Sequence, residues 1–303
     1  MTERVRKIIV SVSVFALGGL LVTLVILRAI SAVRESNKAE AQDMHDSAAS
    51  YVTIPPEPMY QPTEAVAKKA EPSATPAPTG SPTDFPTVSP EPEITEEPNS
   101  DGTERGAWLR SASQYNLDAL YQLNPDLCGW IRIDGTEIDY PIANIGDGPD
   151  KYNELAYDGK TKSAFGTIFT RNKVENGLPK NLVLYGHNME ATGYGMFTQL
   201  MKYQDASFAS SHQDVLIILG NEPYHYKLVC GFHIKVTDEF HYETMSFAGE
   251  KSFLAHVEKE ISLAKVKGSG SVNEGDQILT LSTCDRHYGG KNGRWVLVFV
   301  RVR

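Results

Sequence analysis

The sequence predicts a mostly β domain, a closed or nearly closed barrel, that follows an N-terminal membrane-spanning helix and a long Pro-rich linker. The last 200 residues or so hold about eight short β-rich runs and few helical patterns. These runs do not alternate with helices as βαβ units would, which favours a barrel. A 20-residue apolar run near the N-terminus and an abrupt change to Pro-rich composition define the rest of the chain.

Charge and cysteine content exclude several classes of protein. The 303 residues carry a net charge of −9, but ten acids and two lysines between Tyr51 and Glu104 account for −8 of it. The remaining sequence is close to neutral, so a large basic groove for nucleic acid is not expected. Three scattered cysteines without a Cys-x-x-Cys pair exclude a disulfide-stapled miniprotein and a zinc ribbon.

The N-terminus is typical of an uncleaved signal anchor. Residues 8–27 are uncharged and mostly apolar, and 20 residues at about 1.5 Å each span roughly 30 Å of membrane. Basic residues within 1–7 predict that this tail is cytoplasmic and that the remainder lies outside the cell. A cleaved signal peptide is the alternative. Its apolar region is usually shorter, and Arg28 interrupts the place where a small-residue cleavage site would follow.

Residues 28–105 are expected to form a stalk and a linker. Residues 29–50 are polar and Ala-rich and can continue as a short helical stalk. Twelve of the seventeen prolines lie between Pro55 and Pro98, mixed with Thr, Ser and Glu. Such a segment has too little apolar surface to offset the entropy of ordering it, and it stays extended. We therefore expect a spacer that holds a domain away from the membrane.

The folded domain is expected from residue 106 to residue 303. Leucines near helical spacing predict a helix over Trp108–Leu123, and a second helix is expected over Glu250–Lys265. An Asp-Gly turn at Asp134–Gly135 predicts a β-hairpin. The expected strands are Trp130–Ile133, Thr136–Tyr140, Gly166–Thr170, Asn181–Tyr185, Val215–Leu219, Tyr224–Val236, Gln277–Leu281 and Trp295–Val302.

Cys284 is the candidate nucleophile. It lies at the end of a predicted buried strand, where a rigid scaffold presents reactive groups to a cleft. An odd number of cysteines leaves at least one thiol unpaired in a secreted domain. Cys230 lies within an apolar strand and is expected to be a small core residue, and Cys128 is expected to be structural. A Cys128–Cys230 disulfide is also possible, and the sequence alone does not show whether these two residues are bridged.

His187 and Arg294 are the candidate partners of that nucleophile. His187 directly follows an apolar strand, with Gly186 permitting close approach, and Arg294 precedes the final strand. A cysteine, a histidine and a nearby cation together can form a nucleophilic acyl-transfer site. His225, His233 and His241 are expected to be surface or packing residues. His287 could pair with Cys284 on a metal, but two ligands without a second pair are a weak zinc signal.

These residues resemble the bacterial sortases, and more narrowly class B sortases. The matching segments are Leu-Tyr-Gly-His187-Asn-Met, Thr-Leu-Ser-Thr-Cys284-Asp and Arg294 ten residues later. The order His, Cys, Arg and the 97-residue gap between the first two also fit. The Leu123–Ile131 entry into the domain and the Thr136–Ile142 segment are similar to that family as well, so the resemblance covers residue 117 to the C-terminus.

The resemblance implies an eight-stranded sortase barrel with an N-terminal helix and another helix in the connection between the sixth and seventh strands. It also implies cysteine transpeptidation without a cofactor or metal. Cys284 would attack a Thr carbonyl, His187 would transfer protons, and Arg294 would bind substrate and stabilise the oxyanion. Ser282, Thr283 and Asp285 flank the nucleophile and are candidate substrate-binding residues. For Asp285, a structural role as a turn residue is equally open.

The implied partners are secreted proteins with a C-terminal sorting signal, NPQTN-like or Pro-x-Thr-Gly, and a peptidoglycan amine on a lipid-linked stem peptide. A membrane contact through the N-terminal helix is expected, and nucleic acid is not. The catalytic domain would then face the cell wall. Two alternatives remain: a secreted cysteine protease that mainly hydrolyses its substrate, and a catalytically silent wall-binding module.

Overall fold

The computed structural model describes residues 3–52, 115–172, 174, 178–190 and 193–302, and for residues 3–21 it describes the backbone alone. The helices, with α for α-helices and η for 3₁₀-helices, are α1 (Glu3–Ala49), α3 (Asp118–Leu123), η1 (Lys151–Asn153), η2 (Thr198–Gln204), α4 (Ala206–Ser211), α5 (Glu250–Leu263), α6 (Arg286–Gly289) and η3 (Gly290–Asn292). The strands are β1 (Leu127–Arg132), β2 (Asp139–Asn144), β3 (Ile168–Thr170), β4 (Asn181–Tyr185), β5 (Asp214–Leu219), β6 (Glu222–Lys235), β7 (Val266–Lys267), β8 (Ile278–Cys284) and β9 (Gly293–Arg301).

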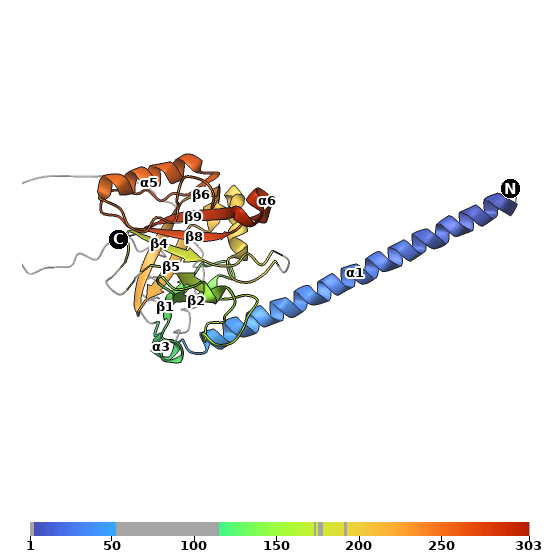
Figure 1. Cartoon of the computed structure of the whole chain (residues 1–303), viewed down its shortest axis with the longest axis horizontal. Helices are drawn as coiled ribbons and strands as arrows, with labels where there is room; N and C mark the ends of the chain where they lie inside the picture. Colours follow the sequence, from blue (N-terminus) through green and yellow to red (C-terminus); the bar gives the residue numbers. More distant parts are fainter. Residues whose placement is uncertain (1–2, 53–114, 173, 175–177, 191–192, 303) are drawn as a thin grey trace, which may run out of the picture.

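Eight of these strands close into a barrel (Figure 1). Their order is β5-β1-β2-β3-β4-β8-β9-β6, and β6 pairs back to β5 to complete the ring. The two-residue strand β7 pairs with β6 outside the ring. The predicted eight-stranded barrel is therefore confirmed. The pairs β2–β3 and β4–β8 are parallel, while the other pairs are antiparallel.

Strand β9 is buried on both faces, which explains why it is an almost continuous apolar run. Trp295, Leu297 and Phe299 belong to the barrel core. The alternating residues Val296 and Val298 belong to a second core on the outer face. Helix α5 covers that face with Phe253 and Val257, among other residues of the same core. A strand alternates its side chains between its two faces, so both faces must be apolar when both are covered.

The predicted elements are close to the observed ones, with differences at their ends. Strand β4 has the predicted bounds, and α5 ends two residues early because the chain then pairs with β6 as β7. The predicted hairpin is present, but its second strand begins at Asp139 instead of Thr136. The turn is longer because Ile133 N–H donates to Ile138 O. Helix α3 begins only at Asp118, and residues 108–114 of its predicted range lie outside the description.

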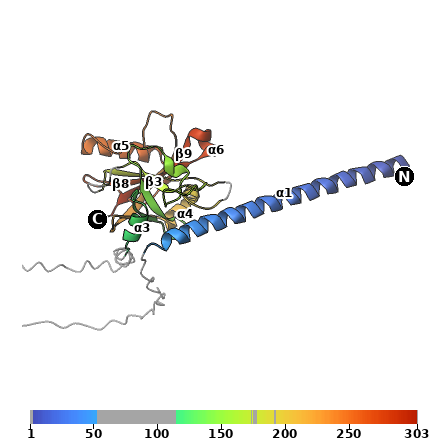
Figure 2. The ribbon, with the colours of Figure 1, turned by 60° about the horizontal axis from the view of Figure 1, so that its bottom comes forward.

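Helix α1 runs without a break through the predicted anchor and the predicted stalk. Its 47 residues correspond to about 70 Å. Figures 1 and 2 show it running away from one side of the barrel, with the N-terminus at the far tip. Within the described part of the chain, no helix has both the length and the apolar character needed to cross a membrane. Most of the predicted span 8–27 lies among residues whose side chains are outside the description, and the Pro-rich residues 53–98 lie outside it entirely.

Candidate active site

Three neighbouring strands bring the candidate catalytic residues to one end of the barrel. Cys284 is the last residue of β8, and the β8–β9 register places it opposite Arg294 at the start of β9. The parallel pair β4–β8 places Tyr185 opposite Ser282, so His187 follows β4 at the same end. The residues are separated in sequence, and strand pairing makes them neighbours.

Hydrogen bonds on both sides of His187 attach its segment to β8. Thr283 Oγ1 donates to Gly186 O over 2.8 Å, and Asn188 Nδ2 donates to Cys284 O over 2.9 Å. The close approach expected at Gly186 is confirmed, because a Cβ atom there would lie 2.7 Å from the Phe197 ring. The backbone of His187 is thus held between two anchor points on the strand that carries Cys284.

The imidazole of His187 is oriented by a backbone carbonyl. Its Nε2 lies 2.8 Å from Asn153 O at the end of η1. A carbonyl oxygen only accepts hydrogen bonds, so Nε2 must carry the proton in this contact. Neutral histidine then has its lone pair on Nδ1, and this nitrogen is the one that can accept a proton from a reacting group.

Arg294 is partly buried, and the turn before it holds its guanidinium group. Nη1 donates to Gly293 O over 2.8 Å and to Lys291 O over 3.1 Å. Both carbonyls belong to the η3 turn that links α6 to β9. The guanidinium group is therefore held near the start of β9. The pairing of β8 with β9 places Arg294 opposite Cys284 there.

The side chains of Ser282 and Thr283 are engaged inside the protein. Both residues are 2% exposed. The Ser282 hydroxyl lies 2.8 Å from the Tyr242 hydroxyl, and that of Thr283 bonds to Gly186 as described above. These contacts position the strand that carries the candidate nucleophile Cys284. The expected substrate contacts of these two residues remain a prediction.

Asp285 is a buried carboxylate that stabilises the turn after the nucleophile. It is 3% exposed and accepts hydrogen bonds from the backbone N–H groups of His287 and Tyr288, which caps α6. Its second oxygen lies 3.0 Å from His233 Nδ1. Burial lowers the pKa of His233, and the nearby Asp285 partly opposes this effect. The turn role considered for Asp285 matches these contacts, whereas its expected contact with substrate remains a prediction.

Tyr242 is a neighbour of the site that the sequence did not indicate. It lies between β6 and α5, is buried, and contacts β8 through Ser282. Burial raises the pKa of its phenol, and the charges of Arg294 and Cys284 also act on it. Tyr242 therefore contacts the strand that carries Cys284, at a residue two positions before it. Its sequence neighbourhood carries no motif that would have singled it out.

The other two cysteines are poor nucleophiles. Burial raises the pKa of Cys128 to about 12 and also raises the pKa of Cys230. All three thiols are free, so the possible Cys128–Cys230 disulfide is absent. Cys284 and Cys128 are both partly exposed, but only Cys284 lies at a strand end beside the His187 segment, which makes it the candidate nucleophile.

The remaining histidines have other partners. His287 is exposed and its Nε2 contacts Glu190, and His225 is buried against Asp214. Over the residues that the structure describes, no group of three or more His, Cys, Asp or Glu side chains is placed to hold a metal ion.

Known sortases are similar to this chain in sequence and in fold. The sortase domain family matches residues 131–302, a range that includes all the candidate site residues. Sortase B of Listeria monocytogenes is 33% identical over 182 residues, which cover 60% of this chain and 72% of that protein. The Staphylococcus aureus sortase B–substrate complex has a TM-score of 0.55 and 26% identity over 61% of this chain and 83% of that one. Clostridium perfringens sortase B has a TM-score of 0.54 and 27% identity over 61% of this chain and 98% of that one.

Proposed function

The chain belongs to the sortase family as a class B member, and we propose that it is a membrane-anchored cysteine transpeptidase that attaches secreted proteins to a peptidoglycan amine. The observation that carries this proposal is the meeting of Cys284, His187 and Arg294 at the ends of β8, β4 and β9. The family supplies the reaction type, and the arrangement of these residues assigns a role to each.

In the first half of the reaction, the Cys284 thiolate attacks the carbonyl carbon of Thr in the sorting signal. A C–S bond forms, and the scissile C–N bond breaks. The departing amine takes the proton that Nδ1 of His187 received from the Cys284 thiol when the thiolate formed. The product is a thioacyl enzyme, in which the secreted protein is bound through its new C-terminus.

In the second half, the acceptor amine attacks the thioacyl carbon. His187 removes a proton from the amine, a new C–N bond forms, and the Cys284 thiolate leaves. One amide bond has been broken and another made, so the sequence of steps needs no oxidant, cofactor or metal.

Arg294 is assigned to the oxyanion and to the substrate backbone. Its guanidinium is held by two backbone carbonyls and retains further N–H donors, since the group has five in total. A positive charge held in place before the reaction stabilises negative charge as it develops on the attacked carbonyl oxygen.

The proposed substrates are secreted proteins with a C-terminal signal that is NPQTN-like or of the Pro-x-Thr-Gly type. The solved complex of Staphylococcus aureus sortase B with substrate supports binding of a sorting signal by this fold. The proposed acceptor is the amine of a lipid-linked stem peptide. The apolar run 8–27, which falls within α1, supports an anchor with a cytoplasmic N-terminus and an extracellular barrel.

The test uses the full chain in detergent micelles with quenched peptides that carry either type of signal. Each peptide is incubated with and without a peptidoglycan-like amine, and the products are identified by mass spectrometry. We expect an amine-dependent ligation product with the wild type and none with Cys284→Ala. Cys128→Ala is the matched control, because it removes a thiol outside the site, and it should ligate.

Three outcomes would contradict the proposal. Ligation that persists in Cys284→Ala would exclude this nucleophile. Cleavage that yields only hydrolysis product in the presence of amine would support the protease alternative. A chain that turns over no peptide, and whose Cys284 is not labelled by a thiol-reactive sorting peptide, would support the silent wall-binding module.

A further inference from the structure

The last turns of α1 pack against the barrel, whereas the preceding turns do not. Ala41 and Ala48 lie two turns apart and are 0% and 1% exposed. Val25 and Val33, earlier in the same helix, are 61% and 59% exposed. The buried face points at β2 and at the segments around Tyr157 and Tyr194. We call residues 38–52 the docking segment.

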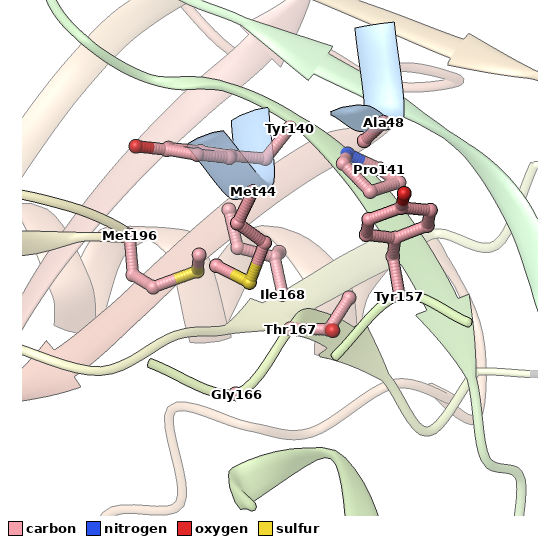
Figure 3. Close-up of a pocket in the computed structure, with 9 residues that line it drawn as sticks. All are labelled: Met44, Ala48, Tyr140, Pro141, Tyr157, Gly166, Thr167, Ile168 and Met196. Carbon is pink, nitrogen blue, oxygen red and sulfur yellow. The ribbon is translucent and has the colours of Figure 1, made fainter. Parts of the chain in front are cut away.

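Figure 3 shows the centre of this contact, where Met44 lies against Ile168 and Met196 beside Tyr140, and Ala48 lies beside Pro141 and Tyr157. The cavity left between them is about 10 Å³, which is room for about one water molecule at most. The two surfaces therefore fit closely, as in a protein interior.

A glycine on the barrel permits this fit. Gly195 has a φ of +91°, a conformation that favours glycine. A Cβ atom added to it would lie 3.0 Å from the Phe165 ring and 3.5 Å from the Ala41 Cβ. Small residues thus face each other where the helix crosses this loop.

Specific polar contacts surround the apolar centre. Tyr194 donates its hydroxyl hydrogen to Gln42 Oε1 over 2.5 Å, and the hydroxyls of Ser47 and Tyr157 are 2.7 Å apart. His45 Nε2 lies 3.6 Å from Asp139 Oδ2. These contacts give the docked helix a defined register on the barrel, which a purely apolar contact would not ensure.

Both ends of the Pro-rich segment lie in the same hydrophobic cluster. Val52, just before residues 53–114, is 7% exposed, and Tyr115, just after them, is 6% exposed. The two residues share this cluster with Ala48 and Leu117. The two residues that flank the 62 intervening residues therefore lie at the same place on the barrel.

We propose that the docking segment holds the barrel to α1, so that α1 and not the Pro-rich segment sets the distance between the anchor and the active site. While the helix is docked, the 22 residues from the end of the predicted span to Ala49 give a reach of about 33 Å. On release, the Pro-rich segment becomes the only connection. Fully extended, 62 residues of such a chain reach ~190 Å.

His45 makes this docking sensitive to pH. The nearby Asp139 carboxylate raises the pKa of His45 most strongly, burial opposes this, and Asp46 of its own helix adds to it. The ring also lies edge-on to Tyr140. The docked state binds the proton more tightly than the released state, so protonation favours docking. The stabilisation of the docked state by protonated His45 is fully present below the ordinary histidine pKa of 6.5. It is lost as pH rises through the higher pKa that His45 has in the docked state.

The test is a distance measurement by double electron–electron resonance, in the full chain in detergent micelles. Spin labels are placed at Val33→Cys and at Lys259→Cys of α5 in a Cys128→Ala/Cys284→Ala background, where the one remaining thiol, Cys230, is buried. At pH 5.5 we expect one narrow distance that does not change when residues 61–90 are deleted. Ala48→Arg should convert it into a broad distribution that shortens with that deletion.

The pH arm uses the same labels between pH 5.5 and 8.5. We expect the broad population to grow with pH in the wild type and to be independent of pH in His45→Gln. His241→Gln is the matched control, because His241 is exposed, also faces a carboxylate, and lies on the β6–α5 connection.

A broad distance in the wild type at pH 5.5, or a narrow one that follows the length of the Pro-rich segment, would overturn the proposal. A narrow distance that does not depend on pH would overturn the role of His45. The measurement uses a catalytically inactive chain. Its result is therefore separate from that of the ligation assay.

Discussion

At the scale of single residues, the geometry of the site depends on side chains that do not take part in the chemistry. Asn188 is the clearest example, because its amide connects the His187 segment to the carbonyl of Cys284. It is a positioning residue, and no motif in the sequence pointed to it.

We predict that Asn188→Ala lowers kcat about fivefold, which corresponds to the loss of one hydrogen bond of about 1 kcal/mol. KM should change little, since Asn188 contacts the backbone carbonyl of Cys284 and is not one of the expected substrate-binding residues. The measurement is steady-state ligation kinetics together with the melting temperature. Asn221→Ala is the control: it removes two hydrogen bonds, with Leu117 and Asp118, that lie away from the site. An equal loss of kcat in both variants would refute the positioning role.

Arg294 has a larger expected effect. Arg294→Ala should lower kcat/KM by about 10²–10³-fold, which is typical for removal of one oxyanion donor. Arg294→Lys should recover only part of this loss, because an ammonium group lacks the planar fork of donors. Measuring kcat/KM for both variants tests the assignment. A fully active Arg294→Ala would remove this residue from the mechanism.

At the scale of elements, α5 carries a buried acid that destabilises its packing. Glu260 is 0% exposed, and His256 Nε2 lies 3.3 Å from its Oε1. Burial raises the pKa of Glu260, and the contact with His256 opposes this. The Glu260 carboxyl loses its proton more readily in the unfolded chain than in the folded one. Its burial therefore destabilises the folded state increasingly as pH rises above 4.5, the ordinary pKa of a glutamate.

Glu260→Gln should therefore stabilise the protein at neutral pH by about 1–3 kcal/mol, since a neutral amide avoids most of this cost and keeps an acceptor for His256. The gain should grow between pH 5 and pH 8. Denaturant unfolding of the two proteins across this range measures it, with the exposed Glu258→Gln as the control. A gain that shrinks as pH rises would contradict the assignment.

At the scale of the whole molecule, the docking segment should contribute to the stability of the barrel. A chain that begins at residue 106 lacks α1, so it exposes the surface around Tyr140 and Met196. We expect it to melt roughly 5–10 °C below the full chain, from about 2–3 kcal/mol of lost apolar burial. Thermal unfolding followed by circular dichroism at 280 nm tests this. Equal melting temperatures would show that the contact adds nothing to the fold.

Much of the fold could be predicted because its strands carry strong local patterns. Strand β4 was predicted with its observed ends, and the apolar run of β9 reflects burial on both of its faces. Helices η2 and α4 and the short strand β7 were not predicted. They are brief, and they are stabilised by contacts with distant parts of the chain that no local pattern encodes.

The candidate site was predicted only in part, for a related reason. The strand-end residues Cys284, His187 and Arg294 stand in recognisable motifs, and their catalytic roles remain predictions. The partner of the imidazole, by contrast, is the backbone carbonyl of Asn153, which any residue type would supply. Tyr242 reaches the site from a connection whose path depends on the finished barrel.

The parallel pairing of β4 with β8 also determines when the site can form during folding. Cys284 and Arg294 are 10 residues apart and meet by closing one local turn, whereas His187 is 97 residues from Cys284. The entropy of closing the longer loop costs about 2 kcal/mol more. Cys284 and Arg294 can therefore come together early, and His187 joins them only as the barrel closes. The three candidate residues are thus neighbours only in the finished barrel.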